Sequence, residues 1–576
     1  MYLKTVSLFA LLLMAFLPVN AQNAGDFPTG YFRDPLDVPI LLAGGYGECR
    51  PDHFHTGIDM KTQGRENLPV HAAADGYIVR ISISSTGYGN CLYIAHPNGY
   101  TTVYGHLNDF YPELQQWMIA QQYAQQKWAI QLFPDPGQFP VKKGQVIAWS
   151  GTTGGSTGPH LHFEIRNTAT EHVLNGELFG LPIKDTRAPK AMAVAIYNGG
   201  TSIYMQSPAI EQLINAGHDQ FRPKAALVKT AYPLVFMGIH AEDYMEGSSN
   251  WMGIYQMKLY MDDQLQAATL FRELDFGLSR YANAYADYKT KKNKGVWYQG
   301  LYKLPNNQLK VYPFMNDRDG KLDLSDGGKH HIRIELFDAF GNKSTVNFDI
   351  QYQAAGQASE TLCGNGQLWD CREAHRYADS DFRFSSGAQS FYDDVCFQIR
   401  KNIQEAALSE SVQVMDADIP VQEACHIGLK LNRVVPDSLQ SKVAFVHHVQ
   451  PTRLPGNNPQ TGTAAAYEDG WATASVRTLG NYYAVIDTVP PKIIAYQSSG
   501  TFKAGQPVRF KATDDLTSVT SFEGYLDGRW LRFVRTGDTY TYKIDDHCPD
   551  GTHTLEVRAV DENNNESVYR MQIKKG

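Results

Sequence analysis

Two histidines separated by one apolar residue are spaced so that both could take part in the same chemistry. His160 and His162 lie in the stretch Gly158–Arg166, which reads GPHLHFEIR. The alternation of apolar and polar residues there is typical of a half-buried β-strand, in which side chains two positions apart point to the same face. The two imidazoles should therefore project together, with Leu161 pointing away. Such a pair suits either a metal ion or proton transfer.

A second candidate cluster lies earlier in the chain. The stretch Arg50–Asp59 reads RPDHFHTGID and places His55 and Asp59 four residues apart. β-Branched residues surround Gly57, so an extended segment is favoured over a helix. The even spacing then puts both side chains on one face, and Gly57 leaves room above them. A neutral imidazole with a carboxylate suits zinc, although this spacing alone is common by chance.

Short strands separated by turn signals should position these residues. The segments of strand character are 69–70, 76–84, 91–96, 101–104 and 141–150. The fourth strand leads into Gly105-His106-Leu107, so we expect His106 at a strand end near the histidine pair. Residues rich in Gln, Ala and Trp predict a helix over 111–131, within an insertion at about 111–139. The whole should be a compact, mostly antiparallel β-domain.

Together these motifs resemble the lysostaphin-like (LytM-type) zinc endopeptidases. The resemblance rests on the HxxxD motif, the YGH element that ends at His106, and the segments VKKGQVIAWSG and GTTGGSTGPHLHFE, over about residues 44–167. It implies His55, Asp59 and His162 as zinc ligands, and His106 and His160 as catalytic histidines beside the metal. Shorter members of the family lack the insertion at 111–139, which would lie beside the cleft and affect the substrate range.

The chemistry that this resemblance implies is zinc-dependent hydrolysis of peptide bonds. Three protein ligands and an open fourth position are the pattern of a catalytic zinc, which activates water and polarises the attacked carbonyl. His106 and His160 could orient or deprotonate water and stabilise the oxyanion. The implied substrate is the peptide part of bacterial peptidoglycan. The alternative is a metal-free relative that acts as a binding or regulatory module and activates another cell-wall hydrolase. The presence of all five residues favours the enzyme.

Several neighbouring polar residues allow more than one interpretation. His53 would share a strand face with His55, so a role beside the metal or the substrate competes with that of a plain polar rim residue. Arg50 could meet a substrate carboxylate or form a surface salt bridge. We expect His71 and His96 to make ordinary hydrogen bonds.

The first residues have the composition of a signal peptide. Lys4 supplies a positive charge, residues 6–17 form an apolar run, and residues 19–21 read VNA, a small-residue cleavage site. We therefore expect residues 1–21 to be removed and the mature protein to be periplasmic or secreted, without a membrane anchor. The formal net charge of -8 provides no basic face for nucleic acid.

The remainder of a 576-residue chain is too long for one core and should form further β-domains. Asp185 opens the sequence DTRAP and Asp487 opens DTVPP. Each region later carries a matching element, GKHHIRIELFDAFGNKS and GTHTLEVRAVDENNNES, in which Asp338 aligns with Asp561. This is an internal repeat. Evenly spaced strand and turn signals after residue 492 predict an immunoglobulin-like sandwich.

We therefore predict a mainly β chain. Its parts are a signal peptide (1–21), the LytM-type peptidase domain (22–184), a β-sandwich with insertions (185–355), a further β-domain (356–486) and an immunoglobulin-like β-sandwich (487–576). The sandwiches could serve a cell-envelope protein partner, or act as spacers that position the catalytic domain. Among the seven cysteines, Cys363 with Cys371 and Cys396 with Cys425 are candidate disulfides.

Overall fold

The computed structural model describes residues 27–354, 363–448, 460–497 and 500–576. Strands make up 47% of it and helices 8%, which confirms the predicted mainly β fold. The predicted signal peptide, residues 1–21, lies outside the described residues. Within the described part of the chain, no helix has both the length and the apolar character needed to cross a membrane.

The first domain is built on an antiparallel sheet whose central strands carry the predicted site. Its hydrogen-bonded order is β1 (Leu42–Gly44), β4 (Ile58–Lys61), β12 (His160–Asn167), β8 (Tyr100–Phe110), β7 (Asn90–Ala95), β6 (Gly76–Ile83) and β10 (Pro140–Val141). Further pairs are β5 (Pro69–His71) with β11 (Val146–Ser150), β11 with β8, β9 (Ile130–Leu132) with β6, and β13 (Val173–Leu174) with β12 and β21 (Glu273–Leu274). A hairpin of β2 (Cys49–Arg50) and β3 (His53–Phe54) precedes β4.

As predicted, successive side chains of β12 lie on opposite faces of the sheet. Leu161 is fully buried in the apolar core below the sheet, while His160 and His162 lie on the other face. His162 pairs with Asp59 of β4 on one side and with Gly105 of β8 on the other. The strand order β4-β12-β8 therefore brings the three motif-bearing segments side by side.

The expected strand end at His106 is wrong. Strand β8 continues past it, and a bulge shifts the register with β7 between the pairs Leu92–Tyr104 and Asn90–Leu107. His106 has a φ of 60°, a left-handed conformation that costs of order 1–3 kcal/mol for a residue other than glycine. Strict alternation would point its side chain away from the site, and the bulge turns it back.

The insertion at 111–139 is less helical than predicted. Helix α1 spans Pro112–Gln125, and strand β9 follows it. Gln126 ends the helix in a left-handed conformation, φ 50° and ψ 43°, which is a common helix terminus. Leu114 and Met118, one turn apart, are buried in the core of the first domain. The helix is therefore packed on that domain.

The second domain follows with a twelve-stranded sheet. The main path of this sheet is β22 (Gln299–Gly300), β18 (Leu234–Glu242), β14 (Lys190–Asn198), β15 (Ala209–Gly217), β16 (Gln220–Pro223), β26 (Lys343–Tyr352), β25 (Lys329–Phe337), β19 (Gln256–Met261), β20 (Gln264–Leu270) and β23 (Phe314–Met315). Strand β17 (Leu227–Thr230) pairs with β26, and β24 (Leu322–Asp323) pairs with β18. This domain also carries the short helices η3 (Ile203–Met205), η4 (Phe276–Tyr281), α2 (Ala282–Tyr285) and α3 (Tyr288–Lys294), while η2 (Gly176–Phe179) belongs to the first domain.

The third region contains two five-stranded sheets and a small two-stranded sheet. The first sheet runs β28 (His375–Ala378), β29 (Phe382–Ser386), β33 (Cys425–Lys430), β37 (Trp471–Val476), β36 (Ala466–Glu468). The second runs β31 (Ile399–Asn402), β32 (Ser411–Val414), β38 (Gly480–Ile486), β34 (Val443–His448), β35 (Gln460–Ala464), with η5 (Asp437–Lys442) before β34. The small two-stranded sheet is antiparallel and consists of β27 (Gln367–Trp369) and β30 (Val395–Phe397), which are not consecutive in the chain.

The C-terminal domain has two sheets that share one core. One runs β39 (Lys492–Ala495), β41 (Pro507–Thr513), β45 (Thr539–Lys543), β44 (Val534–Thr536), and the other β40 (Gly500–Phe502), β47 (Glu566–Lys575), β46 (Gly551–Asp561), β42 (Val519–Leu526), β43 (Arg529–Leu531).

The disulfide pairing differs from both candidate pairs. Cys363 bonds to Cys396, while Cys371 and Cys425 are buried free thiols. The two-stranded sheet of β27 and β30 decides the pairing, because it brings Cys396 next to the turn that contains Cys363. Proximity along the chain therefore did not indicate the partner.

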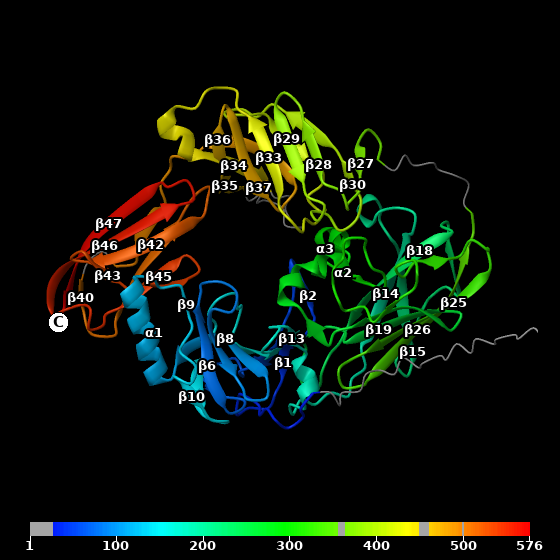
Figure 1. Ribbon diagram of the computed structural model, residues 1–576, viewed down its shortest axis with the longest axis horizontal. Helices are drawn as coiled ribbons and strands as arrows, with labels where there is room; N and C mark the ends of the chain where they lie inside the picture. The colour runs from blue at the N-terminus through cyan, green and yellow to red at the C-terminus, as the bar shows by residue number, and fades with distance from the viewer. Residues whose placement is uncertain (1–26, 355–362, 449–459, 498–499) are drawn as a thin grey trace, which may run out of the picture.

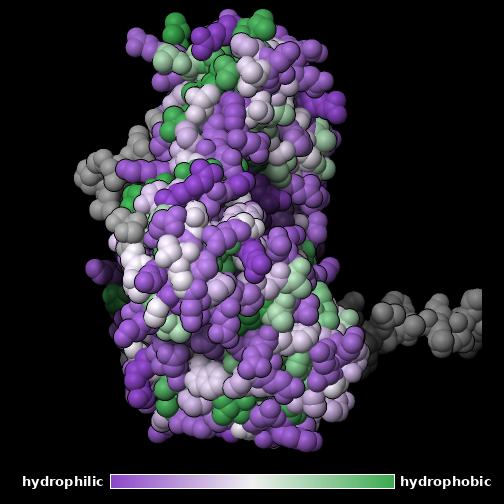
Figure 2. Space-filling model, turned by 90° about the vertical axis from the view of Figure 1, so that its left-hand side faces the viewer, coloured by the Kyte–Doolittle hydropathy of each residue, from purple (hydrophilic) through white to green (hydrophobic). Residues whose placement is uncertain are grey.

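The domains follow one another around a ring that closes on helix α1 (Figure 1). The Tyr123 ring of α1 stacks on His547 of the C-terminal domain, with centroids 3.5 Å apart, and its hydroxyl donates a hydrogen bond to Asp545 (3.0 Å). Arg532 donates to the side-chain oxygen of Gln122. Figure 2 shows that the surface on this side is mostly hydrophilic, with small scattered hydrophobic groups.

Candidate metal centre

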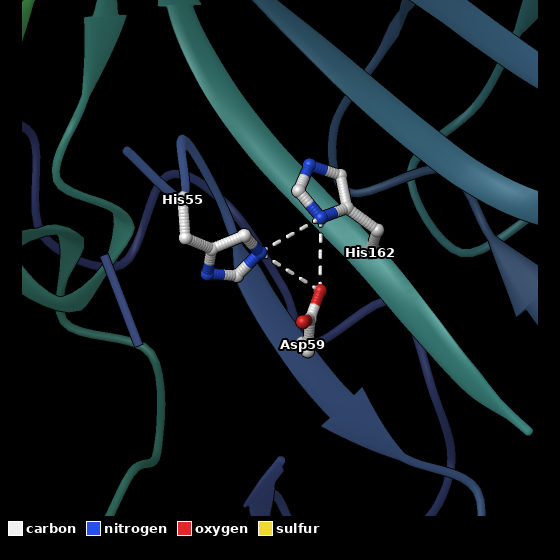
Figure 3. A group of neighbouring side chains, drawn as sticks. All are labelled: His55, Asp59 and His162. Carbon is white, nitrogen blue, oxygen red and sulfur yellow. Dashed lines mark hydrogen bonds and ion pairs between the residues drawn. The ribbon is translucent and has the colours of Figure 1, made fainter. Parts of the chain in front are cut away.

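Three side chains converge on one point in the first domain (Figure 3). His55 follows β3, Asp59 lies in β4 and His162 lies in β12. His55 Nε2 is 3.0 Å from Asp59 Oδ1 and 3.1 Å from His162 Nδ1, and His162 Nδ1 is 2.9 Å from Asp59 Oδ1. None of the three residues is more than 5% exposed. The structure thus brings together the three residues predicted as zinc ligands.

In each predicted ligand histidine, the ring nitrogen that points away from the triangle lies within hydrogen-bond distance of an oxygen atom. His55 Nδ1 lies 2.7 Å from the carbonyl oxygen of Gly45. His162 Nε2 lies 3.0 Å from Glu164 Oε1. A ring N–H donated to a carbonyl or carboxylate leaves the other ring nitrogen with a free lone pair, which is how metal-ligating histidines are oriented in proteins. Both imidazoles therefore present an acceptor nitrogen to the centre.

The spacing of the three inward-facing atoms fits a zinc ion. Donors at about 2.1 Å from a tetrahedral zinc lie ~3.4 Å apart, and the triangle has edges of 2.9–3.1 Å. Movements of a few tenths of an ångström would reconcile the two. Two imidazole nitrogens and one carboxylate oxygen also match the donors of hydrolytic zinc sites that keep one coordination position for water or substrate.

The contacts within the triangle set the charge of its members. Burial favours the neutral form of Asp59, but the three surrounding histidines outweigh it and hold the pKa of that carboxyl well below its ordinary value. Burial lowers the pKa of His55. For His162, burial is outweighed by hydrogen bonds to Asp59 and Glu164, which raise its pKa to about 9. Without an ion, a proton is held at His162, and a bound cation would displace it.

Two glycines leave the space that His162 occupies. A Cβ at Gly57 would lie 2.6 Å from His162 Cε1 and 2.7 Å from the carbonyl oxygen of Phe163. A Cβ at Gly105 would lie 3.3 Å from His162 Cβ. The room predicted above Gly57 is therefore confirmed, and a larger residue at that position must displace the ligand.

His106 and His160 stand beside the triangle. Their ring centroids are 4.7 Å apart, and His160 Nε2 lies 3.5 Å from Asp59 Oδ1. Nδ1 of His106 lies 2.8 Å from the carbonyl oxygen of Thr153, and Nδ1 of His160 lies 2.8 Å from that of Gly158. Each Nδ1–H is therefore donated, which leaves Nε2 to meet water or substrate. Burial, followed by the charge of the neighbouring histidines, lowers the pKa of His106 to about 3.

Of the two roles considered for Arg50, contact with a substrate carboxylate and a salt bridge, the structure shows the salt bridge. One of its partners is Asp59, a predicted zinc ligand. Arg50 Nη2 lies 3.2 Å from Asp59 Oδ2 and 3.3 Å from Glu48 Oε2. The bond to Oδ2 orients the carboxylate so that Oδ1 faces the two histidines. Burial raises the pKa of Glu48 to about 7, although Arg50 opposes the shift. Sequence reasoning did not identify Glu48.

His53, His71 and His96 lie outside the triangle. His53 is exposed, and its Nδ1 lies 3.2 Å from the carbonyl oxygen of Pro51. His71 and His96 make the ordinary hydrogen bonds predicted for them, to the carbonyl oxygens of Gly144 and Asp75 at 2.8 Å each.

Sequence reasoning also missed a group of residues behind His162. Glu164, 1% exposed, accepts hydrogen bonds from the Tyr88 hydroxyl (2.7 Å) and from Arg166 Nε (2.7 Å). Burial opposes the charge of Glu164, but Arg166 and His162 outweigh it and hold the pKa of that carboxyl well below its ordinary value. The signal was present, because Glu164 and Arg166 follow His162 at two and four positions and so share its strand face.

The second domain reaches the edge of this site. Phe276, in η4, is 49% exposed. The Arg166 guanidinium lies over its ring, 5.2 Å from the centroid, and the Tyr88 ring is 6.4 Å away. An exposed aromatic ring at this place can pack against an extended ligand.

Two regions of the chain match the models of known protein families. Residues 53–124 and 123–175 match the model of peptidase family M23. Residues 367–487 match that of the Zu5-like domain.

Three curated relatives share the first region. The DD-carboxypeptidase/endopeptidase Mpg of Neisseria meningitidis is 37% identical over 113 residues, which is 20% of this chain and 20% of Mpg. The peptidoglycan DD-endopeptidase ShyC of Vibrio cholerae is 34% identical over 150 residues, 25% of this chain and 28% of ShyC. Lysostaphin of Staphylococcus simulans is 30% identical over 146 residues, 25% of this chain and 22% of lysostaphin. The chain thus spans less than a third of the length of each relative.

Residues 53–175 belong to the lysostaphin-like (LytM-type) M23 peptidases, as the sequence motifs indicated. The match contains His55, Asp59, His106, His160 and His162.

Proposed function

We propose that this chain is an exported zinc metalloendopeptidase that hydrolyses peptide bonds in the stem or cross-link peptides of bacterial peptidoglycan. The observation that carries the proposal is the triangle of His55, Asp59 and His162, whose histidines are both oriented by a second hydrogen bond. A binding module would not need these orienting contacts. The named activities of Mpg and ShyC support the substrate class.

The residues of the site divide the work. His55, Asp59 and His162 would hold the zinc ion, which when bound polarises the scissile carbonyl and makes water acidic enough to attack. His106 and His160 each keep Nε2 as an acceptor beside the triangle, and one of them would take the proton of the attacking water. The other, once protonated or hydrogen-bonded, stabilises the oxyanion.

Peptidoglycan digestion tests the role of His106. Because His106 has a positive φ, the substitution His106→Asn is preferred to alanine, since asparagine tolerates that conformation. Loss of a general acid–base group lowers the rate by about 10²–10⁴-fold. The control is His53→Asn, which changes an exposed histidine two residues from His55. Equal release of muropeptides by the wild type and His106→Asn would contradict the assignment.

Metal analysis tests the enzyme against the alternative of a regulatory module. We expect one tightly held zinc ion per chain in the wild type and none in Asp59→Asn. A wild-type protein that holds no zinc and digests no wall would instead favour the module that activates another hydrolase. If the wild type digests the wall, mass spectrometry of the released muropeptides will identify the bond that it cuts. This measurement is needed because the similar proteins are named for different cleavages, DD-bonds for ShyC and glycyl-glycine bonds for ALE-1.

A further inference from the structure

Two trios of aspartates occupy equivalent places in the second and the C-terminal domains. In each trio, one carboxylate oxygen per residue lies within 4.8 Å of the others. The trios are Asp185, Asp243 and Asp338, and Asp487, Asp514 and Asp561. The internal repeat in the sequence identified the first and last member of each trio, and the structure adds the middle one.

The strand pairing shows that the middle members correspond. Asp243 directly follows β18, which pairs with β14, the first strand of its domain. Asp514 directly follows β41, which pairs with β39, the first strand of the other. Two domains that differ in length and insertions have therefore kept a carboxylate at the same end of the equivalent strand.

The last member of each trio is held in the same way in both domains. Asp338 accepts hydrogen bonds from the backbone N–H of Asn342 (2.8 Å) and from its side-chain amide (2.6 Å). Asp561 accepts the same two bonds from Asn565, at 2.8 Å each. Each asparagine also donates to the carbonyl oxygen of the linker aspartate, Asp185 or Asp487. The linker is thus tied to the sandwich at this point.

The trios contain buried oxygens without a partner. Asp243 is 4% exposed, and its Oδ1 is buried with no hydrogen bond among the described residues. Asp185 Oδ2 and Asp514 Oδ2 are in the same situation. Within the described part of the chain, none of the six carboxylates has a Lys or Arg ion-pair partner. A buried carboxylate oxygen without a partner is costly, so a cation placed among these oxygens would stabilise each trio.

We propose that each aspartate trio binds one Ca²⁺ ion at the end of its sandwich where the linker enters. The donors are all oxygens, with no imidazole or thiolate, which favours a hard cation over zinc. Ca²⁺ tolerates irregular coordination by carboxylates, backbone carbonyls and water, whereas Mg²⁺ demands near-octahedral geometry. Because the first aspartate of each trio lies in a linker, the ion stiffens the junction with the preceding domain.

Calcium titration of the full-length, zinc-loaded protein tests this site. We expect isothermal titration calorimetry with CaCl₂ to show two sites per chain, with dissociation constants of about 0.1–1 mM, as in extracellular calcium modules. Asp243→Asn and Asp514→Asn should each remove one site, and the double variant both. The matched control is Asp546→Asn, an exposed aspartate outside the trios, which should keep both sites.

Thermal unfolding is a second measurement, and it distinguishes a variant that has lost its calcium ligand from one that is poorly folded. Without calcium, Asp243→Asn should melt at the same temperature as the wild type or higher, because an amide relieves the repulsion in the trio. Calcium should raise the melting temperature of the wild type and raise it less in Asp243→Asn. No calcium-dependent shift in the wild type, equal shifts in the two proteins, or an equal response to MgCl₂ would each overturn the proposal.

Discussion

The Tyr123 side chain makes three of the contacts that close the ring, and replacing it should open the junction. Tyr123 stacks on His547 and contacts the edge of Trp530, with centroids 3.5 and 5.3 Å apart. Its hydroxyl also donates to Asp545. Aromatic pairs contribute about 0.5–1.5 kcal/mol each, and a hydrogen bond to a charged group about 1.5–3 kcal/mol. Because the contact is only partly buried, we take values slightly above the lower end of each range, about 3 kcal/mol in total, for Tyr123→Ala.

A loss of about 3 kcal/mol should lower the closure constant by about 100-fold. Hydrogen exchange is the assay, since α1 and the loop around His547 should exchange faster in Tyr123→Ala. The C-terminal core around Val557 should stay protected, because that domain has a core of its own. Small-angle scattering should show a larger radius of gyration for the variant.

The control for this experiment separates stacking from hydrogen bonding. Tyr123→Phe keeps both ring contacts and loses only the bond to Asp545, so its exchange should be intermediate. His547→Ala should reproduce most of the effect from the other side of the junction. If Tyr123→Ala leaves both the exchange of α1 and the scattering profile unchanged, the contact does not close the ring.

Two further predictions concern the metal centre. Glu48 has a pKa of about 7 in the folded protein against 4.5 for its ordinary value, so its contribution to stability is fully present below about pH 4.5 and is lost as the pH rises through 7. The free energy of unfolding of the zinc-free wild type should therefore fall by about 3 kcal/mol over this range relative to Glu48→Gln. Denaturant unfolding at several pH values measures this, and the same pH dependence of the unfolding free energy in both proteins would refute it. In Gly57→Ala, the added Cβ meets His162, so zinc affinity measured by competition with a chelator should fall at least tenfold. The control is Gly200→Ala, where the nearest atom to an added Cβ is 3.4 Å away, and it should bind zinc normally.

The zinc ligands could be named from the sequence because their motifs resemble those of a known family. His55 lies after β3 and Asp59 in β4, and β4 pairs with β12 across more than 100 positions of the chain, a pairing that no local pattern shows. Alternation along β12 puts His160 and His162 on one face but does not decide which of them is the ligand. The same alternation indicated Glu164, which we could have named.

Other features depend on contacts that no local pattern shows. The direction of His106 follows from a bulge opposite β7, and a bulge has no reliable signal in a single strand. The length of α1 is set where Gln126 leaves the helix, although nothing in the composition there breaks a helix. Cys363 pairs with Cys396 because the non-consecutive strands β27 and β30 pair, and Tyr123 contacts a domain more than 400 positions away along the chain.

The position of His55 shows that the second domain does more than hold the peptidase domain in place. Its chain neighbour Phe54 is fully buried, with its ring 5.2 Å from that of Phe271 and 5.5 Å from that of Tyr285, both in the second domain. The backbone N–H of Phe54 donates to Ser279 Oγ (3.0 Å). One residue of the hairpin is therefore packed into the neighbouring core while the next faces the ion site. Since a shift of the hairpin by less than an ångström would break the triangle around His55, the interface with the second domain fixes the geometry of the metal centre.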